Sequence, residues 1–119
     1  TEAPAAIGVY SQAVESGNTL YISGQIPLIP DSMEIVSENI EEQIEQVFDN
    51  LTAICIEAGA KLDDAIKFNV YLTDLAHFPK VNTAMEQRLA APYPARAVVE
   101  VSALPKGVQV EVDAIVDLS

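Results

Sequence analysis

The chain has 119 residues, and half of them are hydrophobic, which excludes an intrinsically disordered protein. Eighteen acidic residues against six basic ones give a formal net charge of −12, which argues against partners that are polyanions, namely nucleic acids and anionic membranes. No apolar run approaches the roughly 20 residues that a membrane-spanning helix needs. The single Cys55 favours a reducing compartment, so we expect the protein in the cytoplasm. The chain length is that of one domain, which we expect over residues 1–119.

The first third of the sequence predicts an arm, a hairpin and a loop. Residues 1–12 are rich in small residues and are expected to be irregular. Strands are expected at 13–16 and 20–24, joined by a tight turn at Gly17-Asn18. The segment 24–31 is apolar, but two prolines interrupt it, so it is expected to be an edge strand or a loop.

A long amphipathic helix is expected from about Ser37 to Ala58, because apolar residues recur at alternating steps of four and three. Acidic residues fill its first turns, where the positive end of the helix dipole favours them. Gly59 is a residue that commonly ends a helix. The apolar stripe predicts packing against a sheet, and its members are Ile40, Ile44, Val47, Leu51, Ile54 and Ala58.

The remaining segments predict an α+β fold with a mostly antiparallel sheet and two helices on one face. Strands are expected at 65–73, 96–103 and 108–117, and a second helix from Phe78 to about Ala90. The opposite face of the sheet has no predicted cover, which indicates self-association. The residues expected on that uncovered face are Tyr21, Tyr71, Arg96, Val98, Glu100, Glu111 and Asp113.

Arg96 is the candidate ligand-binding residue. The sequence has no glycine-rich phosphate loop, no zinc-ligand spacing and no Ser-His-Asp arrangement, and the other five basic residues are expected to be solvated charges. Arg96 follows Pro92-Tyr93-Pro94-Ala95 and opens a strand of small residues, so its guanidinium is well placed to bind a carboxylate through two hydrogen bonds. The alternative is an ordinary interface salt bridge to one of the many acids.

Glu111 is the second candidate, as a carboxylate that orients or deprotonates water if it is partly desolvated. The alternative is a solvated strand glutamate. If the last two strands formed a simple hairpin, Arg96 would lie roughly 13 Å along the strand from Glu111, too far for one small ligand to touch both. Either these strands are not neighbours in that register, or a second subunit completes the site, or one of the two residues has no function.

Four motifs resemble those of the reactive intermediate deaminase (Rid, formerly YjgF) family over nearly the whole chain. They are A-P-A-A-I-G-V-Y-S-Q at 3–12, I-S-G-Q-I-P at 22–27, P-A-R-A-V-V-E-V at 94–101 and L-P-K-G-V-Q-V-E-V-D-A-I at 104–115. The resemblance implies a chorismate-mutase-like subunit that forms a homotrimer with sites between subunits. It also implies hydrolysis of 2-aminoacrylate or 2-iminobutanoate type substrates to 2-oxo acids and ammonia, with no metal or cofactor.

The resemblance further implies roles for individual residues. Arg96 would bind the substrate carboxylate, Glu111 would hold the attacking water, and Tyr10 would line the pocket from the neighbouring chain together with Ser23 and Gly24. Asn82 also matches a recurrent position of the family, and we assign it to structure more than to catalysis.

Three positions depart from the family pattern. Ala97-Val98 stands where Ser-Cys is frequent, so that only the backbone N–H of Val98 remains for substrate binding. The segment between Asn82 and Arg96 is shorter than usual, and Val9 replaces the usual proline before Tyr10. The alternative to an enzyme is therefore a non-catalytic trimeric module that binds a small carboxylate or regulates a partner.

Overall fold

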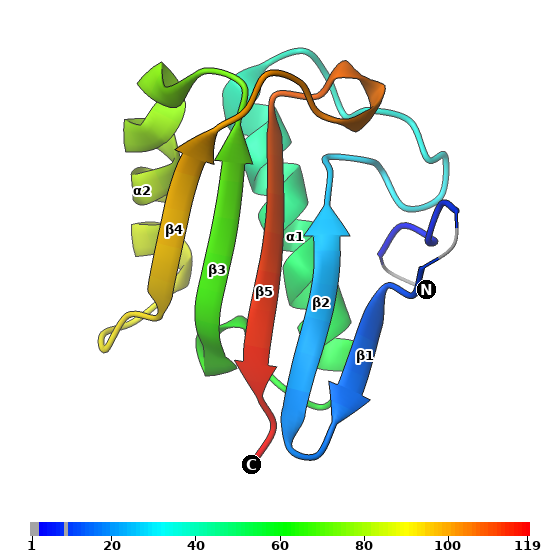
Figure 1. Ribbon diagram of the computed structural model, residues 1–119, viewed down its shortest axis with the longest axis vertical. Coiled ribbons are helices and arrows are strands. Elements are labelled where there is room, and N and C mark those ends of the chain that lie inside the picture. Colours follow the sequence, from blue (N-terminus) through cyan, green and yellow to red (C-terminus); the bar gives the residue numbers. More distant parts are fainter. Residues whose placement is uncertain (1–2, 9) are drawn as a thin grey trace.

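The computed structural model describes residues 3–8 and 10–119, and it contains a five-stranded sheet with two α-helices packed on one face (Figure 1). Single 3-10 turns lie at Leu62–Asp64, Leu75–His77 and Pro105–Gly107. The expected α+β class and the placement of both helices on one side are confirmed. The elements are β1 Ala13–Ser16, β2 Thr19–Gln25, α1 Ile40–Glu57, β3 Ala65–Leu72, α2 Phe78–Arg88, β4 Ala95–Glu100 and β5 Val110–Asp117.

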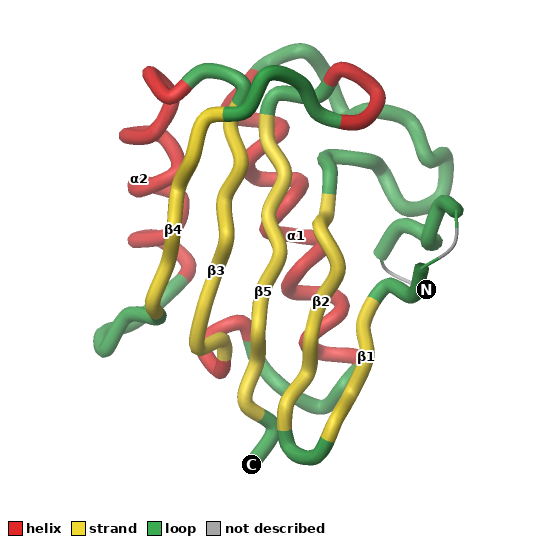
Figure 2. The backbone as a smooth tube through the Cα atoms, viewed as in Figure 1, coloured by secondary structure: helices red, strands yellow, loops and turns green. Residues whose placement is uncertain are grey.

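The strand order across the sheet is β1-β2-β5-β3-β4, so the last strand of the chain lies in the middle (Figure 2). β5 pairs antiparallel with both β2 and β3, whereas β4 pairs parallel with β3. α2 connects β3 to β4, as a parallel pair requires a long crossover. The last two strands are therefore not neighbours, and the simple hairpin considered from the sequence does not form.

The core lies between the sheet and α1, and the alternation of β5 shows how it is built. Val110, Val112, Ala114 and Val116 are buried, while Glu111 and Asp113 point to the other face. In β3 the same alternation holds from Phe68 to Leu72. Strict alternation along 65–73 would place Ile66 on the buried face with Phe68. Ile66 is exposed instead, because the pairing of β3 with β5 shifts between Ala65 and Lys67.

The expected facing of β4 is wrong. In the parallel ladder Arg96 pairs with Phe68, Val98 with Val70 and Glu100 with Leu72. Because directly paired residues of neighbouring strands point to the same face, these three side chains lie on the helix side and not on the open face. β4 is an edge strand beside α2 (Figure 1), so Arg96 and Glu100 remain exposed to solvent although they lie on the helix side.

The buried side-chain amides of Gln43 and Asn50 in α1 form hydrogen bonds with the backbone of neighbouring loops. Gln43 Oε1 accepts a hydrogen bond from Gln109 N at 2.9 Å, and Gln43 Nε2 donates to Ser37 O at 2.8 Å. Asn50 Nδ2 donates to Leu28 O at 3.0 Å. Since buried polar groups must find partners, these contacts fix the segment around Leu28 and the turn that precedes β5.

Cys55 is part of the hydrophobic core. It is fully buried in α1, and burial raises the pKa of its thiol to about 11, with the charge of Asp64 adding to the effect. A thiol of this kind stays protonated and unreactive at neutral pH. In the part of the chain that the structure describes, no helix is long and apolar enough to cross a membrane.

Arg88 was expected to be a solvated charge, but it joins the two helices. Its Nη2 lies 2.6 Å from Glu45 Oε1 and 2.8 Å from Asp49 Oδ1, both in α1. Its Cζ also lies 5.9 Å from the centre of the Phe48 ring. The side chain is only 20% exposed, so the charge contacts are screened less than those of a surface pair.

We predict that Arg88→Met lowers the free energy of unfolding by about 1 to 2 kcal/mol, since it removes two ion pairs and a cation–π contact but keeps an apolar stem. Lys80→Met is the matched control. It removes the same charge from an exposed pair with Glu41 at 3.8 Å, and should change stability little. Urea unfolding of both variants measures this, and equal effects would assign the loss to net charge alone.

Candidate active site

A pocket of about 420 Å³ opens above the sheet where β2, β5, the N-terminal arm and the Pro105–Gly107 turn meet. We call it the Glu111 pocket. It brings together four residues that the sequence singled out, namely Tyr10, Ser23, Gly24 and Glu111. Ile7, Ile26 and Pro105 give it apolar walls, and Lys106 adds a cation. A cavity with apolar walls and a few polar groups is typical of a small-molecule site.

A β-bulge shapes the floor of the Glu111 pocket. β2 pairs regularly with β5 as far as Ile22, and the register shifts between Ile22 and Gln25, so Ser23 and Gly24 lie in the irregular stretch. A Cβ atom added to Gly24 would lie 2.2 Å from Glu111 Oε2 and 2.8 Å from its Cδ. Only glycine therefore lets the Glu111 carboxylate rest against the β2 backbone.

The carboxyl group of Glu111 is partly shielded from solvent. It is half-buried, and this desolvation, together with the charge of Asp113, raises the pKa of its carboxyl above the ordinary value. Asp113 lies two residues along the same strand and accepts hydrogen bonds from Asn69 Nδ2 at 2.8 Å and Tyr71 Oη at 3.3 Å. The solvated-glutamate alternative does not describe this environment.

The N-terminal arm is tied to the pocket through Ser23. Its Oγ donates to Ser11 O at 2.5 Å, and its N–H donates to Gln12 O at 2.9 Å. These bonds hold the residues that follow Tyr10, whose side chain is half-exposed at the pocket. The expectation about Val9 lies outside the described residues.

Arg96 lines a different pocket, of about 300 Å³, with Asn82, Met85, Glu86, Tyr93 and Pro94. We call it the Arg96 pocket. Within residues 3–8 and 10–119, no carboxylate lies within ion-pair distance of this guanidinium. It contacts Met85 Sδ, which lies 3.5 Å from Nη1, and the Phe78 ring, whose centre lies 4.9 Å from Cζ. The salt-bridge alternative for Arg96 therefore finds no partner in the described part of this chain.

The two pockets have no lining residue in common, and they belong to opposite faces of the sheet. Arg96 pairs with the buried Phe68, whereas Glu111 pairs with Tyr71 on the open face. Within one chain, the Glu111 carboxylate and the Arg96 guanidinium therefore line separate pockets. Val98 lies two residues beyond Arg96 on the same face, packed against the core, and is not among the residues that line the Arg96 pocket.

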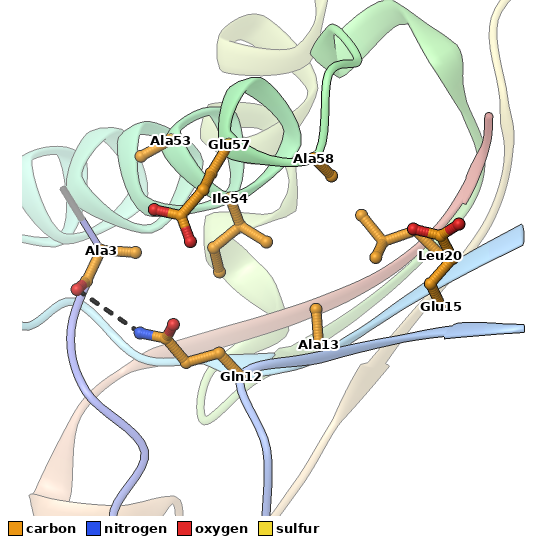
Figure 3. A pocket seen from close by; sticks show the side chains of 9 residues that line it. All are labelled: Ala3, Gln12, Ala13, Glu15, Leu20, Ala53, Ile54, Glu57 and Ala58. Atoms are coloured by element: carbon orange, nitrogen blue, oxygen red, sulfur yellow. Dashed lines mark hydrogen bonds between the residues drawn. The ribbon is translucent and has the colours of Figure 1, made fainter. Parts of the chain in front are cut away.

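A third hollow, of about 330 Å³, lies between β1 and the end of α1 (Figure 3). Glu15 and Glu57 border it, and Gln12 Nε2 donates to Ala3 O at 3.4 Å along one side. Two carboxylates would repel an anionic substrate, and no predicted site residue lines this hollow.

Sequence reasoning missed the residues that complete each pocket. Lys106 was expected to be a solvated charge, yet it lines the Glu111 pocket with its backbone in the left-handed region, at φ 57°. A non-glycine residue in this conformation is uncommon, and the L-P-K-G motif just before β5 was the available signal. Phe78 and Met85 fall within the second helix predicted from the sequence, which assigned them no functional role.

No group of three or more His, Cys, Asp or Glu side chains in the described residues is arranged to hold a metal ion. The polar groups of the two pockets are instead suited to bind a small acid and to move a proton. A guanidinium binds carboxylates, and a glutamate whose pKa is raised by desolvation accepts a proton more readily than a solvated one.

The sequence is similar to curated proteins along nearly its full length. It is 43% identical over 115 residues to the 2-iminobutanoate/2-iminopropanoate deaminase of Mus musculus, covering 97% of this chain and 85% of that protein. It is 47% identical over 114 residues to a RutC family protein of Pyrococcus abyssi, covering 96% and 90%.

Solved structures share the fold. RidA from the Antarctic bacterium Psychrobacter sp. PAMC 21119 superposes with a TM-score of 0.94 at 53% identity, covering 98% of this chain and 94% of that one. Residues 1–118 match the family described as Endoribonuclease L-PSP. The chain therefore belongs to this family, whose curated members similar to it include reactive intermediate deaminases.

Proposed function

We propose that this protein hydrolyses short 2-imino acids and their enamine tautomers, of the 2-iminobutanoate and 2-aminoacrylate type, to 2-oxo acids and ammonia. The observation that carries the proposal is Arg96, a guanidinium at a pocket with no carboxylate partner among the described residues, although the chain has 18 acids. Such a group is available for the carboxylate of a ligand. The deaminase names of relatives that are 41% and 43% identical support the same reaction.

In this proposal Glu111 handles the protons. Its carboxylate takes a proton from water as the water oxygen bonds to C2 of the imine, and the C=N electron pair moves to nitrogen, which takes up a proton. Glu111 returns its proton to the amino group of the resulting carbinolamine and takes up the proton of the hydroxyl. The C–N bond then breaks, ammonia leaves, and the oxygen becomes the 2-oxo group. Because burial and the charge of Asp113 raise the pKa of Glu111, its carboxylate is a better proton acceptor than that of a solvated glutamate. Tyr10 and Ser23 would line the reacting end of the substrate.

A homotrimer would join the two pockets. We propose that the Arg96 pocket of one subunit meets the Glu111 pocket of the next, so that one small acid reaches both. Exposed apolar side chains on the open sheet face, including Val14, Tyr21 and Val99, are consistent with burial in such an assembly. A chorismate-mutase-like arrangement, with the sheets facing inward, is the form that we expect.

The first test generates 2-iminobutanoate with an amino-acid oxidase and follows its loss in competition with semicarbazide. Wild type should lower semicarbazone formation, while Arg96→Ala should lose roughly 10- to 150-fold in kcat/KM, as expected for a charge-assisted contact worth about 1.5 to 3 kcal/mol. Glu111→Gln should lose roughly 100-fold or more. Glu15→Gln, which removes an exposed strand carboxylate outside both pockets, should keep full activity.

Wild-type protein that leaves semicarbazone formation unchanged would reject the deaminase. If such a protein were still stabilised against heat by 2-oxobutanoate, and Arg96→Ala abolished that effect, the chain would be a carboxylate-binding module without turnover.

We further predict that Gly24→Ala lowers kcat through displacement of Glu111, because the added methyl group would overlap Oε2 and Cδ of that carboxylate. The fold should tolerate alanine, since Gly24 is not among the glycines with positive φ. In the Glu111→Gln background the same substitution should cost little more, which a double-mutant cycle measures. Additive losses would show that Gly24 acts elsewhere.

The pH profile offers a separate prediction. Asp113 disfavours ionisation of Glu111, so Asp113→Asn lowers the pKa of Glu111, and the acid limb of kcat/KM should move to lower pH. Tyr71→Phe removes one hydrogen bond to Asp113 but keeps its charge, and should leave the limb in place. A limb that is unmoved in Asp113→Asn would mean that another group sets it.

A further inference from the structure

The guanidinium of Arg96 rests on two apolar groups of α2. Its Nη1 lies 3.5 Å from Met85 Sδ, and its Cζ lies 4.9 Å from the centre of the Phe78 ring. Arg88, the other arginine of the chain, is held instead by two carboxylates. The two arginines therefore differ in what holds their guanidinium groups, although Arg88 is the last residue of α2 and Arg96 packs against the same helix.

α2 presents Phe78 and Met85 on one face, because they are seven residues apart, or about two helical turns. Met85 is buried, and Phe78 is half-buried as the first residue of the helix. Met85 belongs to the buried core, as does Val81, which lies between the two in sequence. A guanidinium that contacts Met85 therefore has a fixed support on one side.

The chemistry of this support suits anion binding. A ring beneath Cζ attracts the cation through its face and competes for none of the five N–H donors. A thioether is only a weak acceptor, so it leaves most of the hydrogen-bonding capacity unused. The guanidinium can then present two parallel N–H groups to a planar carboxylate, a geometry that an ammonium cannot offer.

We propose that Phe78 and Met85 are positioning residues that hold Arg96 in the orientation that binds the ligand carboxylate. This inference rests on the proposed function in one respect, namely that the ligand is a 2-imino or 2-oxo acid. It adds that affinity for the acid depends on α2 side chains that touch only the guanidinium. Their loss weakens ground-state and transition-state binding equally, so it raises KM and leaves kcat unchanged.

The experiment measures KM and kcat for 2-iminobutanoate, together with the Kd for 2-oxobutanoate by calorimetry. Phe78→Leu removes the ring and should raise both KM and Kd about fivefold with kcat unchanged. Phe78→Tyr restores an aromatic face and should return both constants to within about twofold of wild type. Met85→Leu keeps the volume without the sulfur and should have a smaller effect in the same direction.

Val81→Ala is the matched control for packing. Val81 is fully buried in α2 but has no contact with Arg96 that the structure records, so its truncation should lower the melting temperature without raising KM or Kd. If Val81→Ala raised KM as much as Phe78→Leu, general loosening of α2 would replace the positioning role.

Two further results would overturn the inference. The first is a Kd that Arg96→Ala raises and Phe78→Leu leaves unchanged. The second is wild-type protein that binds no 2-oxobutanoate. Binding without turnover would reject the proposed deaminase alone, because the Kd series would still report on Phe78 and Met85.

Discussion

The insertion of β5 between β2 and β3 is the constraint on which the candidate site depends. It places Glu111 against the bulge of β2, where Gly24 leaves room for the carboxylate, and it places Asp113 beside Asn69 and Tyr71. The same insertion leaves β4 at the edge of the sheet, paired only with β3. Arg96 consequently lies next to α2, on the face opposite to Glu111.

The few basic residues of this acid-rich chain differ in what their charges contact. Arg88 balances two carboxylates of α1 and connects the helices, so its charge is used within the fold. Arg96 rests on a ring and a thioether, and Lys106 lines the Glu111 pocket. With a net charge of −12, small anions are repelled at long range, and capture must come from such local cations.

In the proposed function, activity depends on subunit assembly, because Arg96 and Glu111 lie in separate pockets of one chain. A monomer would have an acid-binding group and a proton acceptor on opposite faces of one sheet, in pockets that share no lining residue. Activity would then require subunit contacts, and the exposed apolar residues of the open face provide a physical reason for these contacts to form. α2 would orient Arg96 and Gly24 would leave room for Glu111 within each subunit. Both halves of the site would then have the right geometry before the subunits associate.

The sequence by itself determined the helices, most strand bounds and the alternation of β5, because periodicity is a local property of the chain. The motifs around Tyr10, Arg96 and Glu111 also identified the family. Only the tertiary structure decided the order of the strands, the face of β4 and the contacts of Arg88, Lys106, Phe78 and Met85. These features depend on pairings between residues far apart in the chain. Alternation alone had placed Arg96 on the open face, but the parallel pairing of β4 with β3 directs it toward α2.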